Sequence, residues 1–554
     1  MIKNISKQLL FALALSASLT SCNDWLDLLP NNEQVFDKYW KSKEDVDHVV
    51  TAGYYYMRTT VPTLLNWGEL RGDDFYNIGS GTKANKMQDF DMLPSNDLCS
   101  WTAFYQVIAQ ANSVLEYAPK VDDKTYYTSM MHSHLCEAYF QRAWAYSILV
   151  KNFKEVPLQL NATVSDAAPV RLAKDSESRI IAQIKEDIRA ALALGAAKGY
   201  YEEAWQTKGR ATKWALYALM ADICLWNHDY DECIEYANYI LNATDAFRPV
   251  FIAESTKWFD IFYPGLSNES IFELYWDYNT ENSNNNFTDK FPKVGLLQGS
   301  GDGSLNFSKS ACKKMEAEMT SVMLNNKGVS VSDRVGRTVN ASYVSNSPIN
   351  METAWMWKYR GTDIVDINTV RVHNDANFIL YRVADVMLMK AEALTMKGQS
   401  SWKAAIQIIN TIRTRAALPV FVDLEASNVD ETIETLTQWD MLSEIMSQRE
   451  MEFLGEGHRW YDILRLARYD SRFAPENTVE DLEKSGYESY KTKGMGDDAF
   501  KYKEMALNII LEGNTTTSKA QLRSVLQNSW AWYLPIQQRD IDCDENLIQN
   551  PYYE

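Results

Sequence analysis

Two stretches of the sequence carry ionisable side chains at spacings that could serve acid–base chemistry. The first stretch contains Arg449, Glu450, Glu452, Glu456, His458, Arg459 and Asp462. On a helix and the turn after it, this spacing favours buried ion pairs that fix the last helices more than it favours catalysis. The second stretch is the pair Asp73 and Asp74. A glycosidase needs two carboxyl groups about 5 or about 6.5–9.5 Å apart, whereas we expect adjacent aspartates in a strand or turn to point apart.

The histidines and glycines of the sequence do not form a catalytic or metal-binding motif. His132 and His134 stand two residues apart, so their side chains would diverge on a helix, and an HExxH spacing is absent. The sequence also lacks a GxSxG elbow and a glycine-rich phosphate loop. It therefore predicts a protein without catalytic residues, resident metal or cofactor. Whether calcium is bound cannot be read from the sequence.

One cysteine has a sequence context that predicts covalent chemistry. Lys3 and Lys7 precede an apolar run that ends in Leu19-Thr-Ser-Cys22, which looks like a bacterial lipobox. Such a context predicts a signal peptide over residues 1–21 and a lipid on Cys22, the first residue of the mature protein. Each buried methylene of an acyl chain contributes about 0.8 kcal/mol, so two or three chains hold the protein on a membrane. The alternative is a cysteine that merely ends a signal peptide.

Composition excludes several classes of partner. The chain has 554 residues, of which 46% are hydrophobic and 23% charged, as in globular proteins. A formal charge of −19 without a local Lys/Arg stripe argues against nucleic acid as a partner. The remaining cysteines lack CxxC spacing, so we expect most of them to be buried thiols, with a disulfide only where two fall close together: Cys99, Cys136, Cys224, Cys233, Cys312 and Cys543.

The elements that must position these residues are mainly helices. Helical periodicity predicts packed pairs of helices over 135–153 with 176–194, 211–227 with 231–241, and 385–397 with 401–415. Small residues alternate with aromatic ones on these helices, and the last two pairs resemble tetratricopeptide repeats. The sequence thus predicts a mainly α fold. Between these pairs, residues 243–376 are rich in Asn, Ser, Gly and aromatic residues and predict ordered, functional loops.

Short blocks spread over the chain, in this order, resemble one protein family. The N-terminal blocks are Cys22-Asn-Asp-Trp-Leu-Asp27, Glu69-Leu-Arg-Gly-Asp-Asp74 and Ala138-Tyr-Phe-Gln-Arg-Ala-Trp-Ala-Tyr146. The C-terminal blocks include Asn377-Phe-Ile-Leu-Tyr-Arg-Val-Ala-Asp385, Arg449-Glu-Met-Glu-Phe453 and Gly457-His-Arg-Trp-Tyr-Asp462. Together they resemble the SusD/RagB family, the cell-surface nutrient-binding lipoproteins of Bacteroidetes.

The resemblance implies both an architecture and a partner. It implies an αα superhelix of about four tetratricopeptide-like helix pairs with an irregular, loop-rich ligand-binding face. In these terms residues 22–242 form an N-terminal SusD-like region and residues 243–554 a C-terminal RagB/SusD region, within one structural unit. The family also implies a SusC-like TonB-dependent transporter, over which the protein would sit as a lid at the outer membrane. Asp24 and Asp27, just after Cys22, resemble signals for export to the cell surface.

A glycan site on this scaffold has to be built from aromatic side chains. A flat ring buries the C–H face of a sugar and leaves the hydroxyls to short polar side chains. The candidates lie outside the repeats: Trp67, Tyr76, Trp258, Tyr275, Trp276, Tyr278, Trp355 and Trp357. Of these we rank Trp276, Trp355 and Trp357 first, then Trp67 and Tyr76. Trp355 and Trp357 would share one face of a strand.

Two alternatives to glycan uptake remain open at this point. Some members of the family present peptides to their transporters, and the Asn-rich, aromatic loop over 276–287 could hold an extended backbone as well as a glycan. A surface glycosidase hidden among the acidic residues is the other alternative, which the missing motifs disfavour.

Overall fold

The fold of the protein was analysed in a computed structural model. The structure describes residues 39–554, except for 78–81, 164–170, 279–283, 292–303, 326–332, 340–348, 350–353, 364–369, 470–501 and 515–516. The predicted signal peptide and Cys22 therefore lie outside the described residues. Within these residues, helices dominate and strands are short, which confirms the mainly α prediction.

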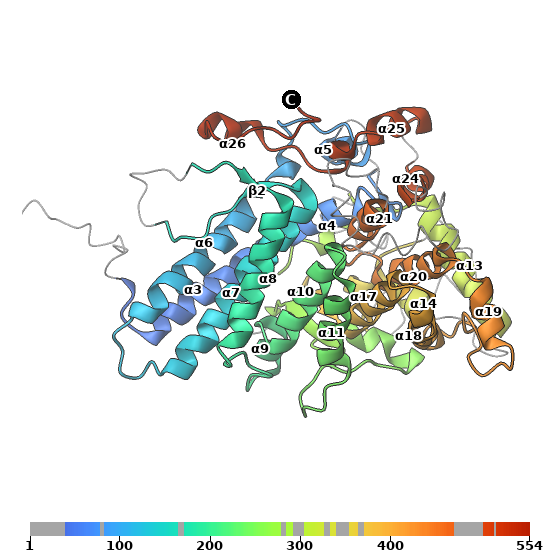
Figure 1. The fold of residues 1–554 in the computed structure, drawn as a ribbon, viewed down its shortest axis with the longest axis horizontal. Coiled ribbons are helices and arrows are strands. Elements are labelled where there is room, and N and C mark those ends of the chain that lie inside the picture. Colours follow the sequence, from blue (N-terminus) through green and yellow to red (C-terminus); the bar gives the residue numbers. More distant parts are fainter. Residues whose placement is uncertain are drawn as a thin grey trace, which may run out of the picture.

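Helices that pack in pairs form the body of the molecule (Figure 1). The four pairs are α3 (Lys43–Thr59) with α6 (Thr102–Tyr117), α7 (Thr128–Phe153) with α8 (Glu177–Ala193), α10 (Lys213–Trp226) with α11 (Tyr230–Leu241), and α17 (Val383–Met396) with α18 (Trp402–Arg415). The last three pairs match the predicted ones. The α3–α6 pair was not predicted.

Local sequence explains where these helices begin and which face they bury. Ser42 starts α3 with a capping box, because its hydroxyl accepts from the Asp45 amide while the Asp45 carboxylate accepts from the Ser42 amide. Helix α8 begins at the Ser176 cap and buries an isoleucine stripe that includes Ile180 and Ile184. Tryptophans inside the repeat helices, such as Trp144, are buried as packing residues.

Further helices and three two-stranded ladders complete the described part of the fold. The other helices are α4 (Val61–Glu69), α5 (Lys83–Gln88), α9 (Ala204–Gly209), α13 (Lys309–Asn325), α14 (Asp333–Thr338), α16 (Trp357–Arg360), α19 (Val429–Thr435), α20 (Gln438–Phe453), α21 (Arg459–Arg468), α24 (Tyr502–Gly513), α25 (Lys519–Leu526) and α26 (Gln538–Cys543). The antiparallel ladders join β1 (Phe75–Tyr76) to β5 (Asn306–Phe307), β2 (Val156–Pro157) to β3 (Lys174–Asp175), and β4 (Ser270–Leu274) to β6 (Phe378–Arg382).

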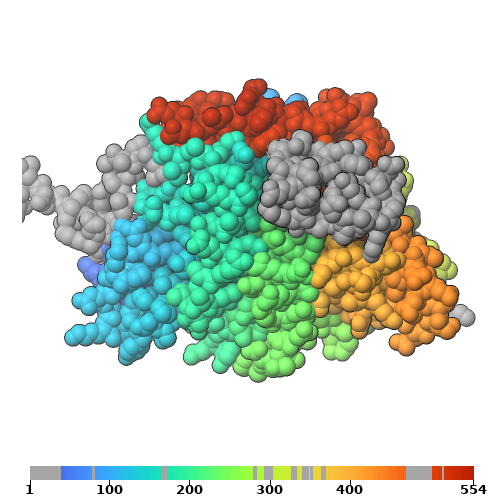
Figure 2. Space-filling view, viewed as in Figure 1, coloured from blue at the N-terminus to red at the C-terminus, as the bar shows by residue number. Residues whose placement is uncertain are grey.

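The two ends of the described chain meet in a common core. One hydrophobic cluster extends from Val46 in α3 to Leu547 after α26. Figure 2 shows the C-terminal segment, in red, lying along the upper edge of the molecule above the N-terminal helices. Among the described residues, no helix combines the length and the hydropathy needed to cross a bilayer.

The cysteines of the described residues are free thiols. Five are buried, as predicted: Cys99, Cys136, Cys224, Cys233 and Cys312. Cys543, at the end of α26, is exposed, so the prediction that most of these cysteines are buried is confirmed with one exception.

Candidate functional site

The charged stretch near residue 450 forms a buried network of ion pairs. Arg449 donates from Nη1 to Asp385 and from Nε to Asp462, both at 2.8 Å, and all three side chains are buried. Arg465 continues the chain of contacts through Asp462 at 2.8 Å and Glu392 at 2.6 Å. The prediction that these charges fix the last helices is confirmed.

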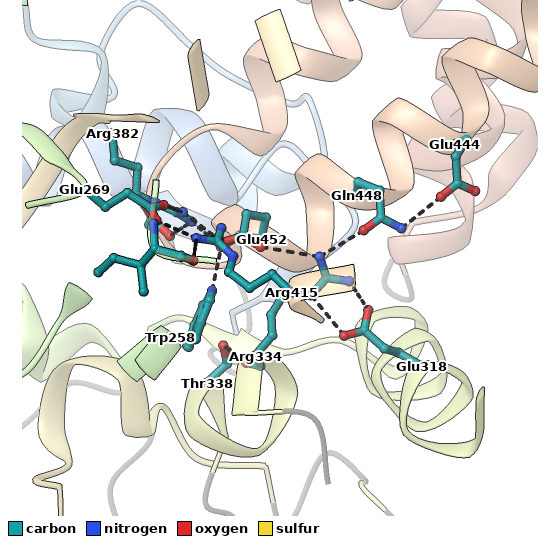
Figure 3. A network of polar contacts seen from close by, with 12 residues as sticks. Trp258, Glu269, Glu318, Arg334, Thr338, Arg382, Arg415, Glu444, Gln448 and Glu452 are labelled. Atoms are coloured by element: carbon teal, nitrogen blue, oxygen red, sulfur yellow. Dashed lines mark hydrogen bonds and ion pairs between the residues drawn. The ribbon is translucent and has the colours of Figure 1, made fainter. Parts of the chain in front are cut away.

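Glu452 is the centre of a second group of buried ion pairs, the Glu452 network (Figure 3). Its carboxylate accepts from Arg382 and Arg415 at 2.8 Å each, and Arg334 lies 3.4 Å away. The Trp258 indole also donates to Glu452, at 2.8 Å. Burial alone would raise the pKa of Glu452, but the three guanidinium groups outweigh it and hold the pKa well below the ordinary value. Glu452 is therefore an ionised structural residue.

Asp73 and Asp74 lie closer together than we expected. Arg459 and Lys314 each donate to Asp73 at 2.6 Å, and Lys314 also reaches Glu450 at 2.7 Å. One oxygen each of Asp73, Asp74 and Glu450 lies within 4.8 Å of the others. The expectation that the two aspartates point apart is wrong. In the turn after α4, both carboxylates face the Arg459 guanidinium, whose Nε lies 2.6 Å from Asp73 and 3.7 Å from Asp74.

The pKa values of Asp73 and Asp74 are shifted in opposite directions. Burial opposes ionisation of Asp73, but Arg459 and Lys314 outweigh it and lower its pKa. For Asp74, burial raises the pKa, and the charges of Glu450 and Asp73 raise it further. Carboxyl pairs of this kind occur in active sites. Here both side chains are at most 1% exposed, so a substrate cannot reach them.

Two groups of side chains have metal-ligand atoms within 4.8 Å of one another among the described residues. In the Asp73 group, Lys314 and Arg459 bond the carboxylates. In the other group, the Lys185 ammonium lies 2.6 Å from both Asp229 and Glu232, beside Cys224. A protein cation therefore already neutralises each group.

The segment 69–74 joins the N-terminal and C-terminal halves of the fold at close range. Glu69 accepts from the Gly457 amide at 2.6 Å, and Arg71 donates to the Trp532 carbonyl at 3.3 Å. A Cβ atom on Gly68 would lie 2.1 Å from the Gly457 carbonyl oxygen, so only glycine allows this approach. These blocks of the sequence are structural.

Two of the predicted ligand-binding aromatics are core residues. Trp67 is fully buried, donates from Nε1 to the Leu98 carbonyl at 2.7 Å, and stacks on Phe104 with ring centroids 5.2 Å apart. Trp357 is 1% exposed and begins α16, and the Cβ of an alanine at Gly361 would collide with its indole. The prediction of a ligand contact is wrong for both. Trp355 and Trp357 also do not share a strand, and Trp355 is half-buried.

Tyr76 and Trp276 lie closer to the surface. Tyr76 is half-buried on β1, where it pairs with Asn306 of β5. Trp276 follows β4 and is 8% exposed, with its ring 5.7 Å from that of Phe287 and 5.9 Å below the Arg58 guanidinium. Ligand contact by Tyr76, Trp276 and Trp355 stays a prediction.

The aromatic pair that is best placed to receive a ligand consists of Trp205 and Tyr275. Their rings are stacked at 5.7 Å with an angle of 21° between the planes, and Trp205 is 38% exposed. Tyr275 was among the candidates, but Trp205 was missed. The available signal was the short aromatic and acidic segment Tyr200-Tyr-Glu-Glu-Ala-Trp205 between two predicted helices.

The local structure holds this pair in place from below. Helix α9 packs against β4, and Lys208 donates to the carbonyl of Ser270, the first residue of this strand, at 2.6 Å. Burial lowers the pKa of Lys208 to about 8, against the opposing charge of Glu273. A Cβ on Gly209 would lie 3.4 Å from Tyr275 Cβ, an ordinary van der Waals distance, so the end of α9 lies directly against Tyr275.

Polar groups surround the pair. Arg58 at the end of α3 donates to the Tyr275 carbonyl at 3.0 Å, and the Tyr275 hydroxyl donates to Asp277 at 3.1 Å. We call Trp205, Tyr275, Trp276, Arg58 and Asp277 the Trp205 platform. The exposed Trp205 ring, backed by the stacked Tyr275 ring and close to a guanidinium and a carboxylate, can stack on a flat, hydroxylated ligand while the polar groups hydrogen-bond its edge.

The sequence was compared with known families. The pattern of the SusD family matches residues 274–553 of the 554. The chain belongs to the SusD family. A second pattern, described as starch-binding associating with outer membrane, matches residues 24–225.

Curated SusD relatives match nearly the whole chain. The SusD-like protein P38 of Formosa agariphila is 25% identical over 86% of this chain and 94% of its own length. The SusD-like protein P2 of the same organism is 24% identical over 84% of this chain and 91% of its own length.

Solved SusD structures share the fold. A SusD superfamily protein from Bacteroides thetaiotaomicron has a TM-score of 0.66 at 19% identity, covering 93% of this chain and 99% of that one. A laminarin-binding SusD-like protein has a TM-score of 0.64 at 18% identity, covering 92% of this chain and all of that one. At these identities the likeness concerns the fold alone. With the helix pairs described above, it confirms the SusD-like architecture.

Proposed function

We propose that this SusD-family protein binds oligo- or polysaccharide at the cell surface and passes it to a SusC-like TonB-dependent transporter for import. The observation that carries the binding step is the Trp205 platform, in which the exposed Trp205 ring stacks on the half-buried Tyr275 ring close to Arg58 and Asp277. Stacked rings offer contact area at little cost in rotamer entropy, while solvated hydroxyl contacts nearly cancel against water. Membership of a family with glycan-binding relatives supports the ligand class.

In this proposal a lipid on Cys22 supplies the only link to the membrane. The residues that the structure describes begin at Tyr39, seventeen positions after Cys22. The family pattern that matches residues 24–225 is described as associating with the outer membrane, which supports this location. Replacing Cys22 by Ala should move the protein from the membrane fraction to the soluble fraction without changing its circular dichroism spectrum.

The ligand proposal is tested with Trp205→Ala on a panel of polysaccharides that includes laminarin and starch, with a peptide mixture beside it. Loss of one stacking ring should weaken binding about 5- to 150-fold, equivalent to about 1–3 kcal/mol, by analogy with stacking on other flat ligands. Tyr127→Ala is the matched control, because Tyr127 is an exposed aromatic residue at the start of α7, outside the platform.

The outcomes separate the alternatives. Binding of a glycan that Trp205→Ala weakens and Tyr127→Ala does not would support the proposal. Binding of peptides alone would favour a peptide-uptake protein on the same scaffold. Release of new reducing ends from a bound polysaccharide would replace the binding role with that of a glycosidase.

A further inference from the structure

A cavity of about 340 Å³ lies between α6 and the C-terminal segment, away from the Trp205 platform. Its walls come from α6, from the chain after α7 and from residues 540–547. Figure 1 places α26 and α9 at opposite edges of the molecule, so this cavity and the platform are separate places. The volume falls in the range of about 300–1,000 Å³ that small-molecule sites occupy.

One face of α6 forms the first wall of the cavity. Trp101, Tyr105, Ile108 and Asn112 follow one another at the spacing of a single helical face and all line it. Ala109, also in the lining, leaves room between the larger side chains. This wall therefore offers apolar and aromatic surface.

Hydrogen bonds join the polar side chains of this wall to the chain after α7, which forms the second wall. Tyr105 donates to the Pro157 carbonyl at 2.7 Å, and Asn112 donates to the Gln159 carbonyl at 3.1 Å. These bonds fix the chain after α7 against α6. The cavity is thus bounded by oriented groups on both of these sides.

The opposite wall supplies a carboxylate with free capacity. Asp544 accepts from the Leu172 amide at 3.0 Å, which fastens the C-terminal segment. Asp540 Oδ2 is buried and lacks a hydrogen-bond partner among the described residues. Its other oxygen lies 3.4 Å from the Arg539 guanidinium, so part of its charge is already balanced. A buried acceptor of this kind calls for a donor from a ligand.

We infer that this cavity is a second saccharide site, which holds one or two units of a neutral sugar with a hydroxyl group on Asp540. Aromatic and aliphatic side chains on one wall, facing the carboxylates of Asp540 and Asp544, suit a ring that has a C–H face and hydroxyl donors. The inference takes its class of ligand, a saccharide, from the proposed function. The residues that would bind this saccharide line the cavity and do not belong to the Trp205 platform.

Cys543 provides a direct readout because its exposed thiol lines the cavity. The full chain carrying Cys22→Ala would be treated with a maleimide in the presence of glucose, galactose, xylose or N-acetylglucosamine and of their short oligomers. At a sugar concentration of about ten times Kd, about one tenth of the sites are empty, so the labelling rate should fall about tenfold. Cys543→Ala identifies the signal, since the other described cysteines are buried.

Two variants test whether protection comes from the cavity. Asp540→Asn removes the charged acceptor but keeps the shape, and it should weaken protection about tenfold or more in sugar concentration. Ala109→Trp should fill the space and abolish protection. If Ala109→Trp fails to fold by circular dichroism, Asp540→Asn decides the question alone.

Trp205→Ala, the variant of the Trp205 platform, distinguishes binding in the cavity from binding at the platform. Trp205→Ala should leave protection of Cys543 unchanged even where it abolishes polysaccharide binding. Absence of protection by every sugar of the panel would overturn the inference, as would protection that survives Asp540→Asn at full strength. Protection that Trp205→Ala removes would also overturn it, because the effect would then arise at the platform.

Discussion

The Glu452 network and the Trp205 platform use the same kinds of side chain for different ends. In the network, Arg382, Arg415 and Arg334 meet one carboxylate and the Trp258 indole in a dry interior. In the platform, a guanidinium and a carboxylate flank stacked rings, and Trp205 remains 38% exposed. The comparison shows that residue type alone does not indicate a binding site. Solvent access and spare capacity for contacts distinguish the two regions.

The difference has an energetic basis. Buried charges must be paired with opposite charges, because an unpaired charge in the interior lowers the stability of the folded state by several kcal/mol. The network therefore has little left to offer a ligand and instead fixes α14, β6, α18 and α20 relative to one another. An exposed ring pair contributes little to folding and keeps its surface for a partner.

The largest expected effect is the loss of Glu452. Glu452→Ala leaves three buried guanidinium groups without their shared carboxylate, and unfolding free energy should fall by about 5 kcal/mol, the upper end for a broken buried pair. Urea unfolding followed by circular dichroism measures it. Asp97→Asn breaks the exposed Lys83–Asp97 pair as a control and should cost less than about 1 kcal/mol. Equal losses in the two variants would contradict the structural role of the network.

The next effect contrasts two tryptophans. Trp67→Ala removes a buried ring that stacks on Phe104 and should lower unfolding free energy by about 4 kcal/mol. Trp205→Ala should change stability by less than about 1 kcal/mol, because its ring is partly exposed. Thermal unfolding of both variants at one pH makes the comparison. A glycan affinity that depends on Trp67 in folded protein would break the assignment.

A smaller and pH-dependent effect is expected at Glu69. Burial raises the pKa of Glu69 to about 8 from the ordinary 4.5. The folded state therefore retains a proton that the unfolded state loses. The stability linked to this group is present below about pH 4.5 and is lost as the pH rises to about 8, by about 1.4 kcal/mol per pH unit.

Glu69→Gln should remove this dependence. Relative to the variant, the wild type should lose about 1.4 kcal/mol for each unit between about pH 5 and pH 7.5 in urea unfolding. Glu44→Gln, on the exposed side of α3, is the control that should keep the wild-type slope. A difference between wild type and Glu69→Gln that stays constant with pH would refute the raised pKa.

The smallest effect separates the two neighbouring aspartates. Asp74 has a raised pKa and neither of its oxygens has a hydrogen-bond partner among the described residues, so Asp74→Asn exchanges groups of similar charge at neutral pH. We expect a change below about 1 kcal/mol. Asp73→Asn weakens the bonds to Arg459 and Lys314 and should cost about 3 kcal/mol. The reverse order in urea unfolding would show that the proton sits on Asp73.

The sequence correctly predicted that the charged block near residue 450 is structural and where most of the paired helices lie, because both follow from the spacing of side chains along a helix. Arg449 and Asp462 stand at a spacing that suits ion pairs between a helix and the next, and the structure pairs them. The isoleucine stripe of α8 faces the core as its period requires. Both depend on regularities within a few turns of chain.

The aromatic site was predictable only in part. Trp67 and Trp357 looked like loop residues, yet both are buried by segments far away in the sequence. Trp205 stacks on Tyr275, seventy positions further along the chain, through the packing of α9 on β4. Such contacts follow from chain topology, which does not leave a periodic trace in the sequence.

The sequence alone therefore determined the helical class, most of the helix pairs and the family, because these follow from local periodicity and from short blocks in a fixed order. Only the tertiary structure decided which charges and rings are accessible. Burial of Asp73 and Glu452, exposure of Trp205 and the free acceptor of Asp540 each result from the packing of segments that lie from tens to hundreds of positions apart in the chain. Accessibility is a property of the packed chain, since the same side chain is a core residue or a binding surface according to what covers it.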